Sequence, residues 1–313
     1  MNIHKGGTVG SQYLLSVARL LLVIGSGLFL SFAAQAETIT PSHVYQASQQ
    51  LINDIKLIRE HSNVTTSAKV PGLQTHKLPL HAYTKSLEVR AKVGRLQKKH
   101  NLPAITAAEI PLKKLTPGDV LESIEVLLAE TDKIKQALNI NQLAPSVPFE
   151  PGKTSSNVYE NLWAASYLLD DLVGPINPNL VFRNVQYALN EVAIIANKLN
   201  IALPDKPPAR QSDIKPKHPN IAGFKNLYRI ARVERKLDIA PVRVSNFPEG
   251  KIAPADVYDT TNNILAELIR LKVHMGATAQ RSSLPVPENK KPADVLMQMQ
   301  LLGSCLETLE QNI

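Results

Sequence analysis

The sequence predicts an all-α protein of eight helices, built as a tandem duplication of a four-helix block. One short phrase recurs along the chain at a fixed spacing, and a helical pattern of apolar residues follows each copy. All 22 prolines fall at the predicted helix starts or between the helices. A first-turn proline loses no hydrogen bond, because the N–H groups of that turn have no partner within the helix. We therefore expect a helical bundle or a short helical repeat array.

The recurring phrase begins with proline and places valine three residues later. Its copies start at positions 41, 79, 117 and 155, and then at 178, 216, 254 and 292, with the copies at 79, 155 and 216 degenerate. The difference between consecutive starts is 38 within each set and 23 between the sets. Adding 137 to each start of the first set gives a start of the second set. This offset predicts two homologous blocks of four 38-residue units.

Each unit opens with a helix whose apolar residues recur at steps of three and four. Thr40 and Thr116 precede the first proline of their helices and are expected N-caps. At the far ends, a residue that tolerates left-handed geometry precedes an apolar residue, which predicts a C-cap; these residues are Asn101, Asn139, Asn200 and Asp238. The predicted helices cover residues 41–61, 79–100, 116–138, 154–173, 177–199, 219–237, 254–275 and 292–311.

The connectors are about 15 residues long, more than most helix–helix connections. A 20-residue helix spans about 30 Å, whereas 15 extended residues reach about 50 Å. A connector can therefore run back along the preceding helix, which favours parallel helices within a block. Apolar residues recur in the connectors, so we expect them to pack and not to be disordered linkers. The link at residues 174–177 is too short for such a return, so the fourth and fifth helices are expected to form an antiparallel hairpin.

The first 36 residues resemble a secretory signal peptide. Lys5 and, directly before the apolar run over residues 20–33, Arg19 supply the positive charge. Ala34-Gln35-Ala36 then forms a small-x-small cleavage signal. We predict a signal peptide at 1–36, a first block at 37–175 and a second block at 176–313, with a periplasmic or secreted product. An uncleaved N-terminal anchor is the alternative.

The sequence offers little support for an enzyme. Phosphate-binding glycine loops, nucleophile elbows and His-Glu zinc motifs are missing, and the adjacent Asp170 and Asp171 point in different directions on a helix. The histidines lack convergent metal spacing, so no metal and no cofactor is expected. The single cysteine, Cys305, excludes an internal disulfide and fits a small buried hydrophobe, with intermolecular pairing or reactivity as the alternative.

Basic residues concentrate on the second and sixth helices, which occupy the same slot in the two blocks. The functional hypothesis is a face that binds an anion or a partner, formed by Arg90, Arg95, Arg229, Arg232 and Arg235. The alternative is that each basic helix lies beside an acidic neighbour of its own block, such as the third helix with Glu122 and Glu125. Aromatic residues do not interleave with these cations, so nucleic acid is not an expected partner.

Three aromatic residues on the fourth helix are a second candidate site. Tyr159, Trp163 and Tyr167 are four apart and could line a pocket for a sugar ring or an acyl chain. The alternative is that they belong to the core or contact the fifth helix.

These patterns favour an exported, non-enzymatic binding or scaffold protein of the bacterial envelope. Repeated helices provide extended recognition surfaces, and the partner would be an unknown protein or an anionic envelope component. The alternative is an extracytoplasmic sensor module that binds a small molecule between helices. An enzyme with an unfamiliar site is the third class.

Overall fold

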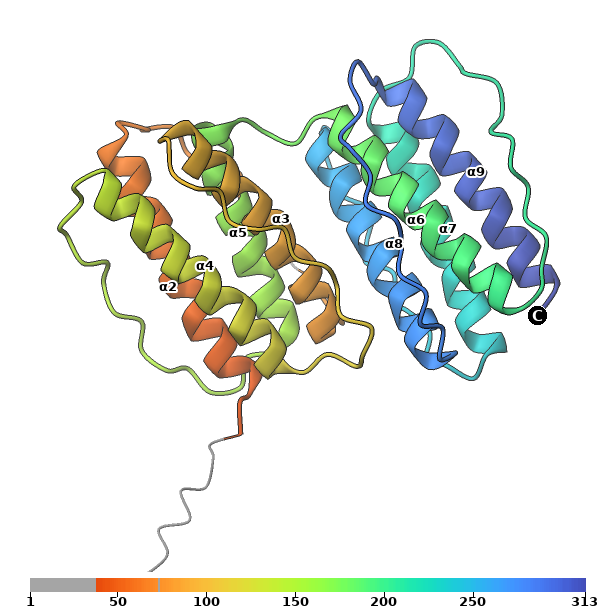
Figure 1. The fold of residues 1–313 in the computed structure, drawn as a ribbon, viewed down its shortest axis with the longest axis horizontal. Helices are drawn as coiled ribbons and strands as arrows, with labels where there is room; N and C mark the ends of the chain where they lie inside the picture. Colours follow the sequence, from red (N-terminus) through yellow and green to blue (C-terminus); the bar gives the residue numbers. More distant parts are fainter. Residues whose placement is uncertain (1–37, 73) are drawn as a thin grey trace, which may run out of the picture. The chain divides into compact units, whose positions relative to one another are not determined.

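The computed structural model describes residues 38–72 and 74–313, and all regular secondary structure in these ranges is α-helical. The predicted signal peptide lies outside the described residues. The described part of the chain forms eight helices (Figure 1): α2 (Pro41–His61), α3 (Pro79–Lys99), α4 (Pro117–Ala137), α5 (Ser155–Val173), α6 (Pro178–Lys198), α7 (Lys217–Lys236), α8 (Pro254–His274) and α9 (Pro292–Gln311). Within these ranges, no helix is both long and apolar enough to cross a bilayer.

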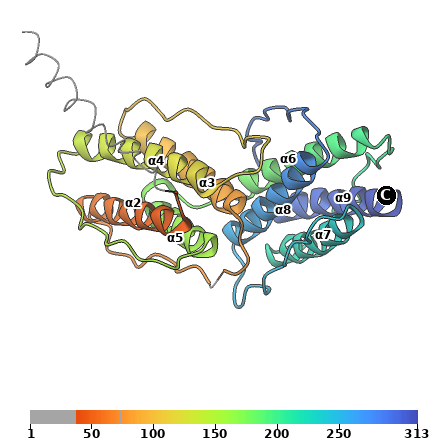
Figure 2. The same cartoon turned by 90° about the horizontal axis from the view of Figure 1, so that it is seen from below.

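The eight helices form two four-helix bundles, each with its own apolar core. In the first bundle, α2 packs against α4 and α5, and so does α3. In the second bundle, α6 packs against α8 and α9, and so does α7 (Figures 1 and 2). The pairing is the same helix for helix, which confirms the predicted all-α fold with two equivalent four-helix blocks.

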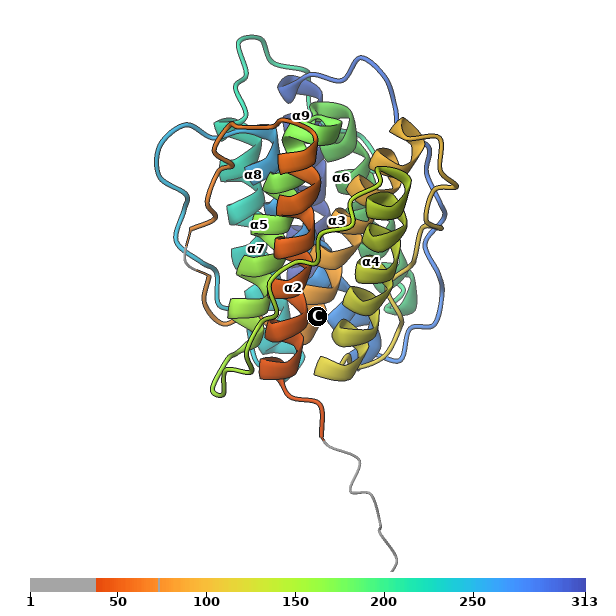
Figure 3. The same cartoon turned by 90° about the vertical axis from the view of Figure 1, so that its left-hand side faces the viewer.

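The helices within each bundle are parallel. The N–H of Lys153, just before α5, donates to Ser42 Oγ at the start of α2 at 3.1 Å, while Arg59 near the end of α2 donates to the Leu168 carbonyl near the end of α5. Figure 3 shows the first bundle from its outer side. In the second bundle, the prolines of all four helix starts line one small apolar depression: Pro178, Pro216, Pro254 and Pro292.

The expected hairpin of the fourth and fifth helices is wrong. The chain reverses direction between α5 and α6 (Figure 1), but these helices are not a packed pair. The bundles meet instead through α3 and α8. Steps of three and four residues indicated which face of each helix is buried, but not which helix covers that face.

A side-chain hydrogen-bond acceptor recurs at the helix N-termini. At seven of the eight, a side chain accepts a hydrogen bond from the backbone N–H three residues earlier, at 2.7–3.1 Å. The acceptors are His43, His81, Asp119, Asn157, His218, Asp256 and Asp294. At α6, the Asn177 side chain accepts from Leu180 N–H at 3.2 Å. The third position of the recurring phrase therefore supplies the acceptor for an N-terminal N–H group.

The predicted C-caps are confirmed. The four predicted residues have φ between 55° and 58°, in the left-handed region. The following residue then closes the helix end, as when Ile140 N–H donates to the Lys135 carbonyl at 2.9 Å. This is the long hydrogen bond of a Schellman motif.

Two buried ion pairs occupy equivalent positions in the two blocks. Lys135 Nζ lies 2.5 Å from Asp54 Oδ1 and joins α4 to α2. Lys272 Nζ lies 2.5 Å from Glu191 Oε2 and joins α8 to α6. Cys305 is buried in the second core, and this burial raises the pKa of its thiol to about 11.

The left-handed C-cap gives a stability prediction. We expect Asn139→Ala to lower the free energy of unfolding by about 1 kcal/mol, because a Cβ without a compensating polar group is disfavoured at positive φ. Asn139→Gly is the matched control and should change stability by less than Asn139→Ala. Urea denaturation of both variants measures the difference, and equal losses would contradict the assigned role of this position.

Candidate functional site

The contact between α3 and α8, called the junction below, is strongly polar. Lys85 is fully buried there, with its Nζ 2.7 Å from Glu88 Oε2 and 2.5 Å from Asp259 Oδ1. Burial by itself would lower the pKa of Lys85, but Asp259 and Glu88 outweigh it and hold that pKa above its usual value. A buried cation compensated by carboxylates from both bundles thus helps to fix the two bundles together.

The predicted aromatic row also lies at the junction. Tyr159, Trp163 and Tyr167 are all buried, and the Tyr159 hydroxyl donates to Asp259 of α8. Lys85 Nζ lies 4.7 Å from the Trp163 ring centroid, within cation–π range. The row therefore connects α5 to α8, and Trp163 also borders a cavity of about 50 Å³.

A buried acid pair lies beside the junction. Glu267 Oε1 is 2.8 Å from His81 Nε2, and Glu267 Oε2 is 2.6 Å from Arg270 Nε. His81 Nδ1 accepts from the Leu78 N–H, so Nε2 carries the proton directed at Glu267. Glu234 hydrogen-bonds to Glu267 and also contacts the Arg270 guanidinium. Burial and the Glu267 carboxylate outweigh Arg270 and raise the pKa of Glu234 to about 8.

The first bundle has an amide side chain at the position where the second bundle has Glu234, the carboxyl with the raised pKa. At the offset between the blocks, the counterparts of Glu234 and Glu267 are Gln97 and Glu130. Gln97 Nε2 donates to Glu130 Oε2 at 2.5 Å. A protonated Glu234 can donate to Glu267 in the same way, so the two bundles keep one hydrogen-bond pattern with different chemistry.

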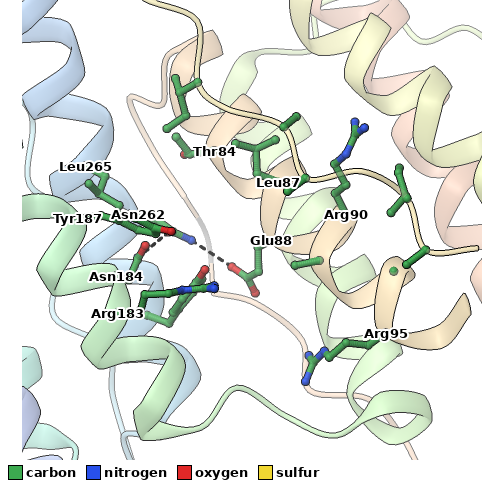
Figure 4. A pocket seen from close by; sticks show the side chains of 18 of the residues that line it. Thr84, Leu87, Glu88, Arg90, Arg95, Arg183, Asn184, Tyr187, Asn262 and Leu265 are labelled. Atoms are coloured by element: carbon green, nitrogen blue, oxygen red, sulfur yellow. Dashed lines mark hydrogen bonds between the residues drawn. The ribbon is translucent and has the colours of Figure 1, made fainter. Parts of the chain in front are cut away.

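A groove of about 300 Å³ opens between the bundles next to the junction (Figure 4). Helix α3 contributes Glu88, Arg90 and Arg95 to its lining, and helix α6 contributes Arg183 and Tyr187. The described lining residues include five cations: Arg90, Arg95, Lys98, Arg183 and Arg281. Apolar side chains complete the wall, among them Leu87, Ile105 and Leu265.

Among the described residues that line the groove, Glu88 is the only acidic one. Burial would raise the pKa of Glu88, but Lys85 and Lys92 outweigh it and hold that pKa below its usual value. The Glu88 oxygens also accept from Ser166 at 2.5 Å. They accept from Asn262 at 3.2 Å as well (Figure 4). Because other groups already compensate Glu88, its charge does not cancel the groove arginines.

Two of the groove arginines keep donors unused. Arg95 donates no hydrogen bond to another described residue, and Arg183 Nε is buried without a partner in the described chain. Burial lowers the pKa of Arg95, while Asp170 acts in the opposite direction. Arg90 Nε, by contrast, donates to the Thr106 carbonyl at 2.7 Å. Guanidinium groups with free donors are suited to bidentate contacts with carboxylate or phosphate.

The five arginines predicted as a binding face divide between two places. Arg90 and Arg95 line the groove. The other three lie on α7, where Arg232 Nε is 2.5 Å from Glu310 Oε1 and Arg229 Nη2 is 3.5 Å from Glu307 Oε2, while Arg235 is exposed. These ion pairs join α7 to α9 of the same bundle. The acidic neighbour is therefore α9 and not the helix equivalent to α4.

Sequence reasoning missed Arg183, Arg281 and the tyrosines of the groove. Arg183 is an isolated cation on α6 and Arg281 lies in a connector, so neither belongs to a basic run. The guanidinium of Arg281 lies 4.5 Å from the Tyr187 ring centroid, which holds both side chains at the groove wall. Only the way the bundles meet brings these residues to α3.

Comparison with protein-family models, curated proteins and solved structures found no match. Among the described residues, no cluster of three or more His, Cys, Asp or Glu side chains is placed to hold a metal ion. The functional argument therefore depends on the groove and the junction.

The acid pair predicts a pH effect on stability. Between the usual value of 4.5 and about 8, folded Glu234 keeps a proton that the unfolded chain releases, so stability falls as pH rises through this range. Glu234→Gln replaces the titrating carboxyl with a neutral amide, so this loss of stability with rising pH disappears. We expect the variant to gain about 1–3 kcal/mol over wild type between about pH 5 and pH 8, measured by urea denaturation.

The reciprocal variant is the control for this pH effect. Gln97→Glu places a carboxyl beside Glu130 in the first bundle and should lose stability over the same pH range. Parallel pH profiles for wild type and Glu234→Gln would contradict the raised Glu234 pKa.

Proposed function

We propose that this chain is an exported, non-catalytic binding protein of the bacterial envelope that holds an anionic ligand in the groove between its bundles. One observation carries the proposal: five cations converge on a groove of about 300 Å³ whose single acidic lining residue is already compensated. Residues 1–36 support export, to the periplasm or the medium.

The free donors give the ligand its expected chemistry. A carboxylate or phosphate group near Arg95 and Arg183 would use donors that have no partner in the described chain. The groove volume is at the lower end of the range of about 300–1,000 Å³ for small-molecule sites. Leu87 and Ile105 suit an apolar portion, so the favoured ligand is a small anion with an aliphatic or ring body.

The alternative is an extracytoplasmic sensor that uses the same groove. Arg95 belongs to the first bundle and Arg183 to the second. A ligand that contacts both would stabilise one arrangement of the bundles over others, which couples occupancy to conformation. A scaffold for an acidic protein is favoured less, because the two best-placed arginines are half-buried in a groove.

Ligand binding is tested through thermal stability. We expect citrate, glucuronate or inorganic phosphate at millimolar concentration to raise the Tm, because a ligand that binds the folded state stabilises it. The double variant Arg95→Gln/Arg183→Gln should lose most of this shift, measured by differential scanning fluorimetry against sodium chloride of equal ionic strength.

Arg235→Gln is the matched control, because this exposed α7 arginine lies away from the groove. It should keep the wild-type response. Equal Tm shifts for the double variant and wild type, or no shift with any of the three anions, would contradict the groove as an anion site.

A further inference from the structure

The junction is asymmetric, and this asymmetry leaves two counterpart faces outside it. Helix α3 of the first bundle meets α8 of the second. With the offset of 137, the counterpart of α3 is α7 and the counterpart of α8 is α4. Helices α4 and α7 do not pack against each other within the chain (Figure 2). The face of α7 that corresponds to the junction exposes Ile221 and Lys225, and that of α4 exposes Glu122 and Glu125.

We propose that a second copy of this chain docks on these faces. Helix α7 of one molecule packs against α4 of the next, in the register with which α3 packs against α8 within the chain. Each junction contact then corresponds to a pair of positions between molecules, obtained by adding 137 to the α3 residue and subtracting 137 from the α8 residue.

The clearest counterpart is a histidine–carboxylate contact. His81 Nε2 lies 2.8 Å from Glu267 Oε1 at the junction. The corresponding pair between molecules is His218 and Glu130. His218 Nδ1 accepts from the Lys215 N–H at 3.0 Å, as His81 does from its own helix start, so both rings have one orientation. His218 Nε2 has no partner within the described chain, and Glu130 would supply one.

A second junction contact corresponds to two different residue types that can still attract each other. Glu88 accepts from Asn262 at 3.2 Å in the junction. The corresponding residues between molecules are Lys225 and Glu125, which carry opposite charges and are both exposed. A chance pairing of two surfaces would not favour opposite charges at this position over like charges.

At two further positions, both residues of the junction pair differ in polarity from both residues of the corresponding pair between molecules. Lys77 Nζ lies 2.6 Å from Asn263 Oδ1, and the corresponding pair, Ile214 and Val126, is apolar on both sides. About one turn further along α3, the polarity changes in the opposite direction: a buried apolar pair at the junction corresponds to an exposed pair of opposite charges. The residues of that position are Leu80 and Ile269 at the junction, and Lys217 and Asp132 between molecules. Matched changes of this kind indicate that the two faces fit each other.

One junction contact has no equivalent between molecules. The buried Lys85–Asp259 ion pair corresponds to Ala222 and Glu122, so this charge pair is lost. The contact between molecules is therefore weaker than the junction. Because it uses different faces of the two partners, it is heterologous and can repeat into short chains of molecules.

Sedimentation velocity of the purified protein over a concentration series tests this proposal. We expect concentration-dependent association that continues past the dimer and weakens as salt rises. Lys225→Glu and Glu125→Lys should each weaken association about tenfold or more, because each brings like charges together. The double variant Lys225→Glu/Glu125→Lys restores opposite charges and should recover association.

Lys56→Glu is the matched control, since this exposed α2 lysine lies on neither face. It should associate like wild type. Should a charge reversal lower the helix content in circular dichroism, Lys225→Gln and Glu125→Gln replace the reversals. A monomer at all concentrations up to about 1 mM, or association that neither face variant weakens, would overturn the proposal. Groove variants such as Arg95→Gln leave both faces intact, so the two proposals fail separately.

Discussion

The parallel direction of the helices within each bundle is the constraint on which the rest of the fold depends. Four N-termini lie at one end of each bundle, so no C-terminus of the same bundle offsets the positive ends of the helix dipoles. Each helix start must then satisfy its own N–H groups, and the acceptor at the third position of the recurring phrase does this at seven starts. Parallel order also requires each connector to travel the length of a helix, which explains why the repeat unit is much longer than the helix it contains.

Much of this fold could be predicted because its signals are local. Prolines and capping residues marked the helix ends, and connector length favoured parallel order before any contact was known. The hairpin of α5 and α6 was wrong because the deciding interactions are distant in sequence. Tyr159 and Lys85 find their partner Asp259 at least 100 positions along the chain, and helical periodicity carries no information about such partners.

The candidate site was predictable only where the two blocks repeat a feature. A basic helix in both equivalent slots pointed to Arg90 and Arg95, which line the groove. The same slot on α7 has a different local role, because α9 supplies Glu307 and Glu310 as partners. Arg183 carried no signal, since a single cation on a helix is ordinary in a soluble protein. Equivalent positions thus diverged after duplication, as Gln97 and Glu234 also illustrate.

The four-residue link between α5 and α6 changes how strong the junction must be. Residues 174–177 tether the two bundles, so closing the junction is an intramolecular step with an effective concentration of about millimolar or higher. A contact dominated by buried polar groups, whose net contribution is modest because desolvation opposes it, can therefore remain closed. If the junction opens, the same link keeps the two bundles within reach of each other, so reclosure needs no diffusional encounter.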